Sequence, residues 1–570
     1  MTMKNLLSVF SLLCFLACGQ LQAQVYVEEA VNGGITISPL GIVGKNINPN
    51  VNQTNTALGS QALKSTNANG SQNVAIGLSA LFDNSSGSRN TAVGSQALTN
   101  NSTGQGNTGI GYNSLMNVTT GIGIVGIGEY ALNAATTAAD NVGVGRYVLF
   151  ANKTGVDNAA LGAWALYSND GGHDNTSVGS KTLYFSNGSS YNTAIGSRAL
   201  YYNTGGAANT AVGYYSMFNN TSGHNNTASG YQSMEDNKIG KNNVAIGTGA
   251  MTGSVAQHYN TVVGSSAMAY GYSSASESSG FNTAVGYQAL RGSTIAANNS
   301  GTYNTVVGSQ AMFLNTSGQN NIAVGFQALY SNALALNNVG VGSYTLHANF
   351  QGAANTALGH YSLSSVTTGN SNTSVGSYSG GNINSGSQNI TIGNSAGSNL
   401  TSGSNNIIIG SSANVPIASG NNQIRMGNNA ITDAEIQVAW TVTSDKRWKE
   451  QIQSLPLGID FIKSLKPVQY VRKNDKSKSV EMGLIAQDLE QTLVDFRKDN
   501  MGLLKKDDNG YLAVRYNDLM APMIKAMQEQ QAMIEKLIKE NQSLQAEVRE
   551  IKNTLAASSN GNVISNESKK

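Results

Sequence analysis

Cysteine and proline are scarce in this 570-residue sequence. It contains two cysteines, Cys14 and Cys18, both close to the N-terminus. Disulfides and cysteine-bound metals are therefore excluded from nearly the whole chain. The six prolines leave a long gap between Pro49 and Pro416. Such a gap suits a β-ladder, because proline cannot donate the backbone hydrogen bond that a central strand needs.

Charge is scarce as well. Only 11% of the residues are charged, the formal net charge is +2, and no Lys, Arg, Asp or Glu occurs between Arg291 and Arg425. A chain without a basic stripe lacks the clustered cations that bind phosphate, which excludes nucleic acid as the main partner. Nothing in the composition points to a metal ion or an organic cofactor, and we expect neither.

The N-terminus carries the pattern of an export signal. Lys4 precedes an apolar run from Leu6 to Ala17. This pattern predicts a signal peptide over residues 1–23, too short to span a membrane comfortably, then a lead-in segment over 24–50. We expect an exported protein at the cell surface or outside the cell, with no transmembrane segment after signal removal. Leu16-Ala17-Cys18 is weakly similar to a lipoprotein signal, so a lipid anchor at Cys18 is a second, less favoured interpretation.

The middle of the chain repeats with a period of 17 residues. Units such as NTAVGSQAL at Asn90, NTAIGSRAL at Asn192 and NIAVGFQAL at Asn321 share the consensus N-T-A-V-G-x-x-A-L-x-x-N-x-x-G-x-x. Twenty-one units begin between Asn55 and Asn406; seventeen of the twenty intervals are 17 residues, one is 18 and two are 22. A short regular period indicates stacked supersecondary units.

Each unit is too short for a βαβ element and too rich in Gly and Asn for paired helices. Its Thr-Ala-Val segment favours a strand, and the Gly and Asn that follow favour turns. We therefore predict a mainly β fold, a parallel β-coil (β-roll) over residues 51–420, roughly 100 Å long for 21 coils at about 4.8 Å each. Apolar residues such as Val93 and Leu98 would stack in a column, Asn side chains would form an amide ladder, and the two long intervals would hold five-residue loop insertions.

The repeat also accounts for a motif that would otherwise suggest a nucleotide site. Gly121, Gly123 and Gly126 have the G-x-G-x-x-G spacing of a dinucleotide-binding turn. That turn needs a long following helix and an acidic residue about 20 positions further on, and no helix-length pattern follows here. Gly128 falls at the fifth position of its unit, where nearly every unit has Gly. We therefore interpret these glycines as part of the repeat.

The units resemble the left-handed β-roll heads of YadA-like trimeric autotransporter adhesins and related repeats in phage tail fibres. The similarity covers residues 51–420, although adhesin heads typically have a shorter period. It implies a homotrimer with three coils packed side by side, and an adhesin-like role with a surface ligand, for which a glycan is one candidate.

After a transition segment at 421–443 the composition becomes that of an ordinary globular domain, over residues 444–519. A heptad pattern over residues 520–556 then predicts a trimeric coiled coil; the alternative is a single amphipathic helix on a globular core. Residues 557–570 are expected to be a disordered tail. The heptad positions a are Met520, Met527, Ile534, Asn541, Val548 and Leu555, and the positions d are Met523, Gln530, Leu537, Leu544 and Ile551.

The start of the globular segment carries the motif S-D-x-R-x-K, formed by Ser444, Asp445, Arg447 and Lys449. Taken alone, Ser444 or Asp445 before a basic turn is readily explained as a helix N-cap. With KPVQY, GLIAQDLEQTL and VRYNDLMAPMIKAMQE downstream, however, the motif resembles the C-terminal intramolecular chaperone of endosialidase-type tail spikes. This resemblance covers residues 444 to about 556 and implies a small α+β autoprocessing peptidase domain.

The resemblance implies that Ser444 and Lys449 form a catalytic dyad and that the chain is cut between Thr443 and Ser444. Two residues depart from the family pattern, Trp448 where Leu is usual and Gln451 where Asn is usual. A serine hydroxyl attacks only when a base takes its proton, and lysine is a base only when neutral, a form that burial favours.

A spacing of five does not align two side chains on one helix face. We therefore expect Ser444 in the approach strand or cap and Lys449 on the first helical turn, folded back. Geometry that is completed only in the trimer would limit the reaction to one cut per chain.

Two further groups of side chains recur in phase with the repeat. His173, His224 and His258 share one repeat phase, just after the late-Gly position, and we interpret them as solvated turn residues because no carboxylate cluster accompanies them. Recurrent tyrosines, such as Tyr214 and Tyr231, follow the fifth-position Gly. Packing or surface exposure explains them, with sugar binding as an alternative.

The sequence as a whole favours an exported homotrimeric fibre. Its C-terminal chaperone would align near-identical repeats in register and would then be released by self-cleavage. In one alternative the trimer remains, but the C-terminal module is a permanent cap that does not cut. In another the β-coil degrades a glycan, as some tail spikes do, although the repeats offer no paired carboxylates in an apolar setting.

Overall fold

The computed structural model describes residues 35–38, 41–44, 54–65, 70–271, 276–295, 298–498 and 501–564. The predicted signal peptide, residues 1–23, lies outside this set. The chain divides into two compact units, Met1–Ile407 and Ile408–Lys570. Within the predicted lead-in, strands β1 (Ile35–Ser38) and β2 (Gly41–Gly44) pair as an antiparallel hairpin.

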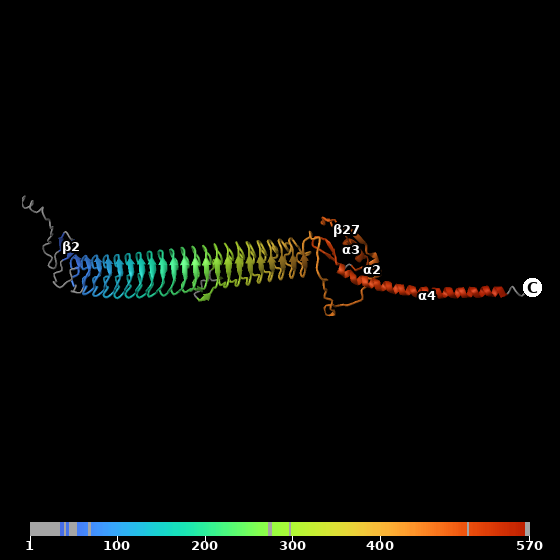
Figure 1. Ribbon diagram of the computed structural model, residues 1–570, viewed down its shortest axis with the longest axis horizontal. Helices are drawn as coiled ribbons and strands as arrows, with labels where there is room; N and C mark the ends of the chain where they lie inside the picture. The colour runs from blue at the N-terminus through green and yellow to red at the C-terminus, as the bar shows by residue number, and fades with distance from the viewer. Residues whose placement is uncertain are drawn as a thin grey trace, which may run out of the picture. The chain divides into compact units, whose positions relative to one another are not determined.

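A ladder of three-residue strands, one per coil, builds the first unit (Figure 1). Each strand pairs in parallel with the strand of the next coil, so that Ala92 lies between Ala75 and Gly109. The predicted parallel β-solenoid of 17-residue coils is thereby confirmed. The strands of the ladder are β3 (Thr56–Leu58), β4 (Val74–Ile76), β5 (Thr91–Val93), β6 (Thr108–Ile110), β7 (Val125–Ile127), β8 (Val142–Val144), β9 (Ala159–Leu161), β10 (Thr176–Val178), β11 (Thr193–Ile195), β12 (Thr210–Val212), β13 (Thr227–Ser229), β14 (Val244–Ile246), β16 (Thr261–Val263), β18 (Thr283–Val285), β19 (Thr305–Val307), β20 (Ile322–Val324), β21 (Val339–Val341), β22 (Thr356–Leu358), β23 (Thr373–Val375) and β24 (Ile390–Ile392).

The core of a coil is narrow and consists of small residues plus one large one. In the coil that begins at Asn90, the side chains of Ala92, Ala97 and Leu98 are fully buried. Val93 is only half-buried. The prediction for Leu98 is confirmed. Val93 also stacks in register with the same position of the neighbouring coils, as predicted, but on the outer face, because successive side chains of a strand point to opposite faces and the central Ala92 takes the inward one.

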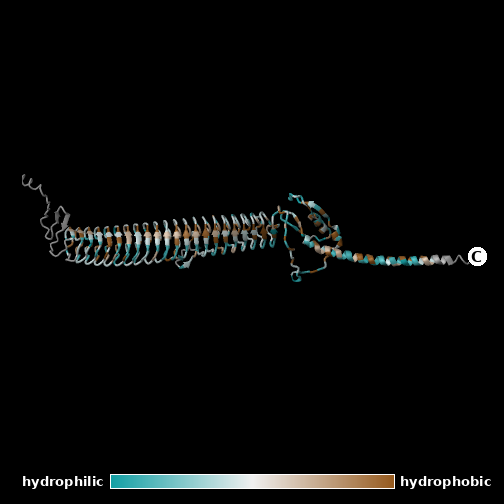
Figure 2. Ribbon diagram, in the orientation of Figure 1, coloured by the Kyte–Doolittle hydropathy of each residue, from teal (hydrophilic) through white to brown (hydrophobic). Residues whose placement is uncertain are grey.

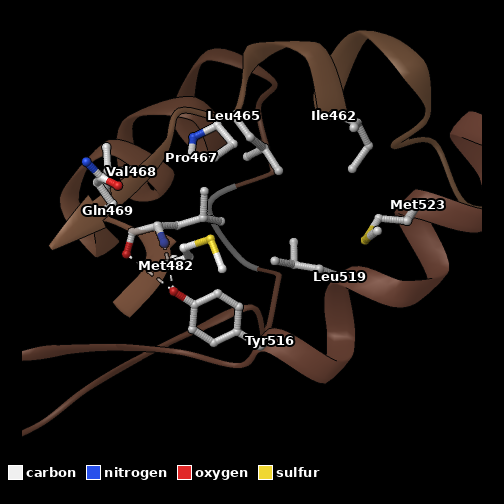
Figure 3. A pocket seen from close by; sticks show the side chains of 11 residues that line it. Ile462, Leu465, Pro467, Val468, Gln469, Met482, Tyr516, Leu519 and Met523 are labelled. Atoms are coloured by element: carbon white, nitrogen blue, oxygen red, sulfur yellow. Dashed lines mark hydrogen bonds between the residues drawn. The ribbon is translucent and has the colours of Figure 1, made fainter. Parts of the chain in front are cut away.

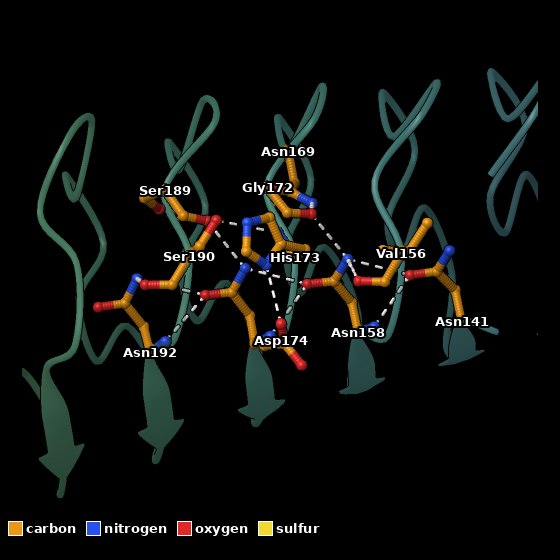
Figure 4. A network of polar contacts seen from close by, with 11 residues as sticks. Asn141, Val156, Asn158, Asn169, Gly172, His173, Asp174, Ser189, Ser190 and Asn192 are labelled. Atoms are coloured by element: carbon orange, nitrogen blue, oxygen red, sulfur yellow. Dashed lines mark hydrogen bonds and ion pairs between the residues drawn. The ribbon is translucent and has the colours of Figure 1, made fainter. Parts of the chain in front are cut away.

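The predicted amide ladder is present at the corner before the strands, interrupted at Ile124 before β7 (Figure 4). The backbone N–H of Asn158 donates to Asn141 Oδ1 at 3.0 Å, and Asn158 Nδ2 donates to Gly172 O at 2.8 Å. Asn175 repeats both contacts one coil further on, bonding to Asn158 Oδ1 and to Ser189 O. Each amide therefore joins consecutive coils and satisfies buried backbone groups at the same time.

A short second ladder marks the coil with the first long interval. Strand β15 (Gln257–His258) pairs in parallel with β17 (Ser278–Ser279). His258 is only 6% exposed there, and its Nδ1 accepts from the backbone N–H of Lys241 at 2.9 Å. The prediction of a solvated turn residue is wrong for His258, because the added residues pair alongside it and cover it.

The second unit begins with β25 (Ile407–Ile409, shared with the first unit at its start) and β26 (Ile424–Met426), where the Gly427 N–H donates to Ile409 O at 2.7 Å. A small α+β domain follows, as predicted. Its elements are the 3₁₀ turn η2 (Lys446–Trp448), α2 (Ile459–Ser464), β27 (Pro467–Val471), β28 (Val480–Leu484), α3 (Ala486–Asp495), β29 (Leu504–Lys506), β30 (Leu512–Val514) and the 3₁₀ turn η3 (Tyr516–Leu519). Strands β27 and β28, and likewise β29 and β30, form antiparallel hairpins.

One cluster of apolar side chains holds this domain together. Leu457, Phe461, Leu489, Leu493, Leu503 and Leu519 are its buried members. They come from α2, from α3, from η3 and from the segments beside them. The domain thus has a core of its own, separate from the solenoid.

The last element is α4 (Met520–Ile564), a helix of 45 residues that runs past the predicted end of the heptads at 556. Its first turns pack on α2, and Ala526 is buried there. Every side chain from Gln531 to Ser558 is exposed. The helix is as predicted, and the coiled coil stays a prediction. In the part of the chain that the structure describes, no helix is long and apolar enough to cross a membrane.

Candidate functional site

The sequence motif at the start of the globular domain folds into one compact turn. Asp445 is the N-cap of η2 (Lys446–Trp448), and its Oδ1 accepts from the backbone N–H of Arg447 at 2.8 Å. The N-cap predicted for this motif is therefore Asp445, which leaves the hydroxyl of Ser444 available for another contact.

Arg447 strengthens this turn. Its Nη2 donates to Asp445 Oδ2 at 2.8 Å, and its Nε also donates to the same carboxylate. The guanidinium group and the backbone N–H of Arg447 together hold the pKa of Asp445 below its ordinary value. Asp445 therefore stays ionised and keeps the turn closed.

The turn brings Ser444 and Lys449 together. Lys449 is the residue directly after η2, one position later than the predicted place on the turn, with an extended backbone at φ −124° and ψ 138°. Its Nζ donates to Ser444 Oγ at 2.6 Å. The predicted fold-back of the lysine is thus present, although no helix face aligns the two side chains.

Both members of the pair are open to solvent in the single chain. Ser444 and Lys449 are exposed, and Trp448 beside them is 81% exposed. A lysine can take a proton from serine only in its neutral form, which solvent disfavours and burial favours. In the single chain the two groups are therefore within hydrogen-bonding distance, but their surroundings are not desolvated.

The globular domain also contacts the chain that precedes the motif. The Asp508 N–H donates to Pro416 O at 3.0 Å, and the Ala418 N–H donates to Asp508 Oδ2 at 2.7 Å. Asn474 Nδ2 donates to Asn429 O. Two loops of the domain thus touch the part of the second unit that precedes the motif. The sequence analysis did not identify these residues, since a lone Asp or Asn in a loop gives no signal of its partner.

Rows of stacked aromatic rings follow the solenoid. Neighbouring rings lie 5.0 to 5.2 Å apart with interplanar angles of 16° or less. The row consists of Phe150, Tyr167, Tyr184, Tyr201 and Phe218. These five residues are spaced 17 apart in the sequence, so the repeat period alone predicts that their rings stack. The tyrosines that follow the fifth-position Gly form a separate pair here: Tyr214 and Tyr231 stack with ring centroids 5.8 Å apart and are 44% and 48% exposed.

The sequence predicts no metal-binding or cofactor-binding residues. Among the residues that the structure describes, no three His, Cys, Asp or Glu side chains gather as a metal ion would require. His173 has Asp174 as a neighbour at 2.8 Å and packs edge-on against Tyr191. This contact is a pair on the surface, without a third ligand.

Comparison with known proteins assigns the C-terminal segment. Residues 444–497 match the family model described as chaperone of endosialidase. No curated protein matches the chain. The match begins at Ser444 and ends just after α3. The chain therefore combines a β-roll of 17-residue coils with an endosialidase-type chaperone domain.

Proposed function

We propose that this chain forms an exported homotrimeric fibre, adhesin-like in character, and that its C-terminal domain aligns the chains and is then released by self-cleavage between Thr443 and Ser444. The observation that carries this proposal is the 2.6 Å contact between Lys449 Nζ and Ser444 Oγ, at the first residue of the segment that matches the chaperone of endosialidase. The predicted signal peptide supports export.

The chemistry follows from the position of Ser444 next to the bond that is cut. Neutral Lys449 takes the Oγ proton, and Oγ bonds to the carbonyl carbon of Thr443. The C–N bond then breaks as the lysine returns the proton to the Ser444 nitrogen, which leaves an ester between Thr443 and Ser444 Oγ. One water molecule hydrolyses this ester and frees the Thr443 carboxylate and the Ser444 hydroxyl.

Helix α4 supports assembly into an oligomer. Its heptad residues Met527, Leu537 and Leu544 are 68%, 61% and 59% exposed in the single chain. Apolar side chains at heptad positions stabilise a helix when they pack against a partner helix, and most of the stability of a helix in water comes from such packing. Three copies of α4 would bury this seam.

The outer face of the solenoid strands supports the same conclusion. The last strand residue of many coils is apolar and points outward, as do Ile195, Ile246 and Leu358. Figure 2 shows that the strand residues as a group are mostly hydrophobic, as a brown band along the solenoid. A row of exposed and half-buried apolar side chains of this kind marks an interaction surface, and identical chains side by side would cover it.

The test is the intact mass of the chain, expressed without residues 1–23, beside three variants. Ser444→Ala and Lys449→Ala should stay whole, whereas the wild type and the control Lys446→Ala, in the same turn, should give a fragment that begins at Ser444. A wild-type trimer that stays whole would instead favour a permanent cap without cleavage, the alternative reached from the sequence.

A further inference from the structure

An apolar groove lies open on the chaperone domain beside the start of α4 (Figure 3). Its volume is about 620 Å³. Side chains of α2, β28, η3 and the first turns of α4 line it, including Ile462, Met482, Leu519 and Met523. Met482 is 88% exposed. An open apolar groove of this size on so small a domain indicates a binding surface for an apolar segment.

The same unit also contains an exposed apolar segment, residues 436–442. Ile436, Val438, Trp440 and Val442 alternate with polar or small residues, and they are 54%, 77%, 74% and 74% exposed. Alternation with a period of two is the pattern of a strand with one apolar face. Within the described residues, no backbone hydrogen bond joins residues 433–443 to another part of the chain.

We propose that the groove of one copy receives segment 436–442 of a neighbouring copy. Met523, which lines the groove, is a predicted d position of the α4 heptads, so the groove borders the seam where the proposed trimer brings another chain. In the single chain the segment lies exposed while the groove is open, so each copy has one unfilled groove and one uncovered segment. This inference rests on the trimer of the proposed function.

The arrangement would couple cleavage to assembly. Val442 lies one residue before Thr443, so anchoring the segment also fixes the Thr443 carbonyl against Ser444 Oγ. Reactions of this kind depend steeply on such positioning, since a displacement of about 1 Å can cost roughly 100-fold in rate. In a chain without a neighbour the Ser444–Lys449 pair would be present, but the Thr443 carbonyl group would not be fixed against it.

Cysteine cross-linking tests the contact directly, because the chain without residues 1–23 contains no cysteine. In a Ser444→Ala background, Val438→Cys with Met482→Cys should form a disulfide between chains. The control pair, Gln437→Cys with Met482→Cys, places the thiol on the opposite strand face and should cross-link at least roughly tenfold less.

Light scattering on the same samples separates the outcomes. A trimer in which the Val438–Met482 pair forms no interchain disulfide would overturn the inference and leave the proposed function standing. Cross-linking by Val438→Cys alone would also overturn it, because the segment would then pack on its own equivalents. A monomer would overturn the inference and the proposed trimer together.

A second variant tests, without cysteines, whether anchoring of the segment is coupled to cleavage. Trp440→Ser in the cleavable chain should slow release of the Ser444 fragment by roughly tenfold or more, while Thr441→Ser, on the other face, should leave the rate unchanged. An unchanged rate in a trimeric Trp440→Ser protein would contradict the coupling.

Discussion

Glycine at the fifth position of each coil is required by the neighbouring coil as well as by its own backbone. Gly128 has φ +137°, and a Cβ added there would lie 2.3 Å from Gly145 O. The same contact recurs at Gly94, where the Cβ would lie 2.6 Å from Gly111 O. Within the G-x-G-x-x-G spacing itself, Gly121 is also packed against the next coil, since a Cβ there would lie 2.6 Å from Ala138 O.

Gly128→Ala should accordingly destabilise its coil by roughly 3 kcal/mol, through backbone strain and collision with the next coil. Hydrogen exchange should show faster exchange in strands β6 to β8 and little change elsewhere, because coils contact only their neighbours. In the control Gly205→Ala, the Cβ would have Thr221 O as its nearest neighbour at 3.8 Å, and we expect a change within about 0.5 kcal/mol. Equal effects of the two substitutions would contradict this account.

The asparagine ladder gives a second test at the level of one side chain. Asn226 Nδ2 donates to Asn209 Oδ1 at 3.1 Å and to Gly240 O at 2.8 Å. Asn226→Asp would replace this donor with a buried carboxylate oxygen facing two other oxygens, at a cost of roughly 2–4 kcal/mol. Thermal melting should show a loss at pH 7 that is partly recovered as the pH falls toward about 4, because burial against other oxygens raises the pKa of the carboxyl in the folded state above its value in the unfolded chain. Asn225→Asp, on the exposed neighbour, should melt like the wild type at both pH values.

At the scale of elements, a single carboxylate joins α4 to the chaperone core. Glu529 on α4 accepts from the backbone N–H of Ile459, the first residue of α2, at 2.7 Å. That bond, with help from Lys525, holds the pKa of Glu529 below its ordinary value of 4.5. A depressed carboxyl pKa contributes stability that is present above pH 4.5 and is lost as the pH falls through the lower folded value.

Glu529→Gln should therefore remove part of the acid sensitivity of the chaperone domain. Circular dichroism melts between pH 7 and pH 3 should show a smaller loss of melting temperature for this variant than for the wild type, because the amide oxygen still accepts and does not titrate. Glu547→Gln, further along the same helix, is the matched control. The contact has no role in acid unfolding if both variants follow the wild-type curve.

The elements differ in how far the sequence could predict them. The 17-residue period determined the strand spacing, the Asn ladder and the burial of Leu98, because each is a contact between identical positions of successive coils. The period could not tell which face of Thr91–Val93 points inward, since three residues are too few to show alternation. It also could not show that His258 is covered, because that depends on how the inserted residues pair. The contact between Ser444 and Lys449 was expected only from resemblance, as no rule of helix spacing joins residues five apart.

At the scale of the whole molecule, near-identical coils create a problem of register. Chains shifted by one coil would present almost the same surface to each other, so the pairing of repeats alone selects the correct register weakly. In the proposed function the α4 helices align the C-terminal ends first, and the coils then pair from a fixed start. Release of the chaperone would leave a fibre that unfolds slowly and lacks the template for refolding.

The central claim is that cleavage follows assembly, and native mass spectrometry of the refolding chain measures this most directly. We predict that chains cut before Ser444 appear only in trimers. Leu537→Asp with Leu544→Asp on α4 should abolish both trimer and cut, while Lys539→Asp, off the heptad seam, should change neither. A cut monomer, in the wild type or in the Leu537/Leu544 variant, would contradict the account.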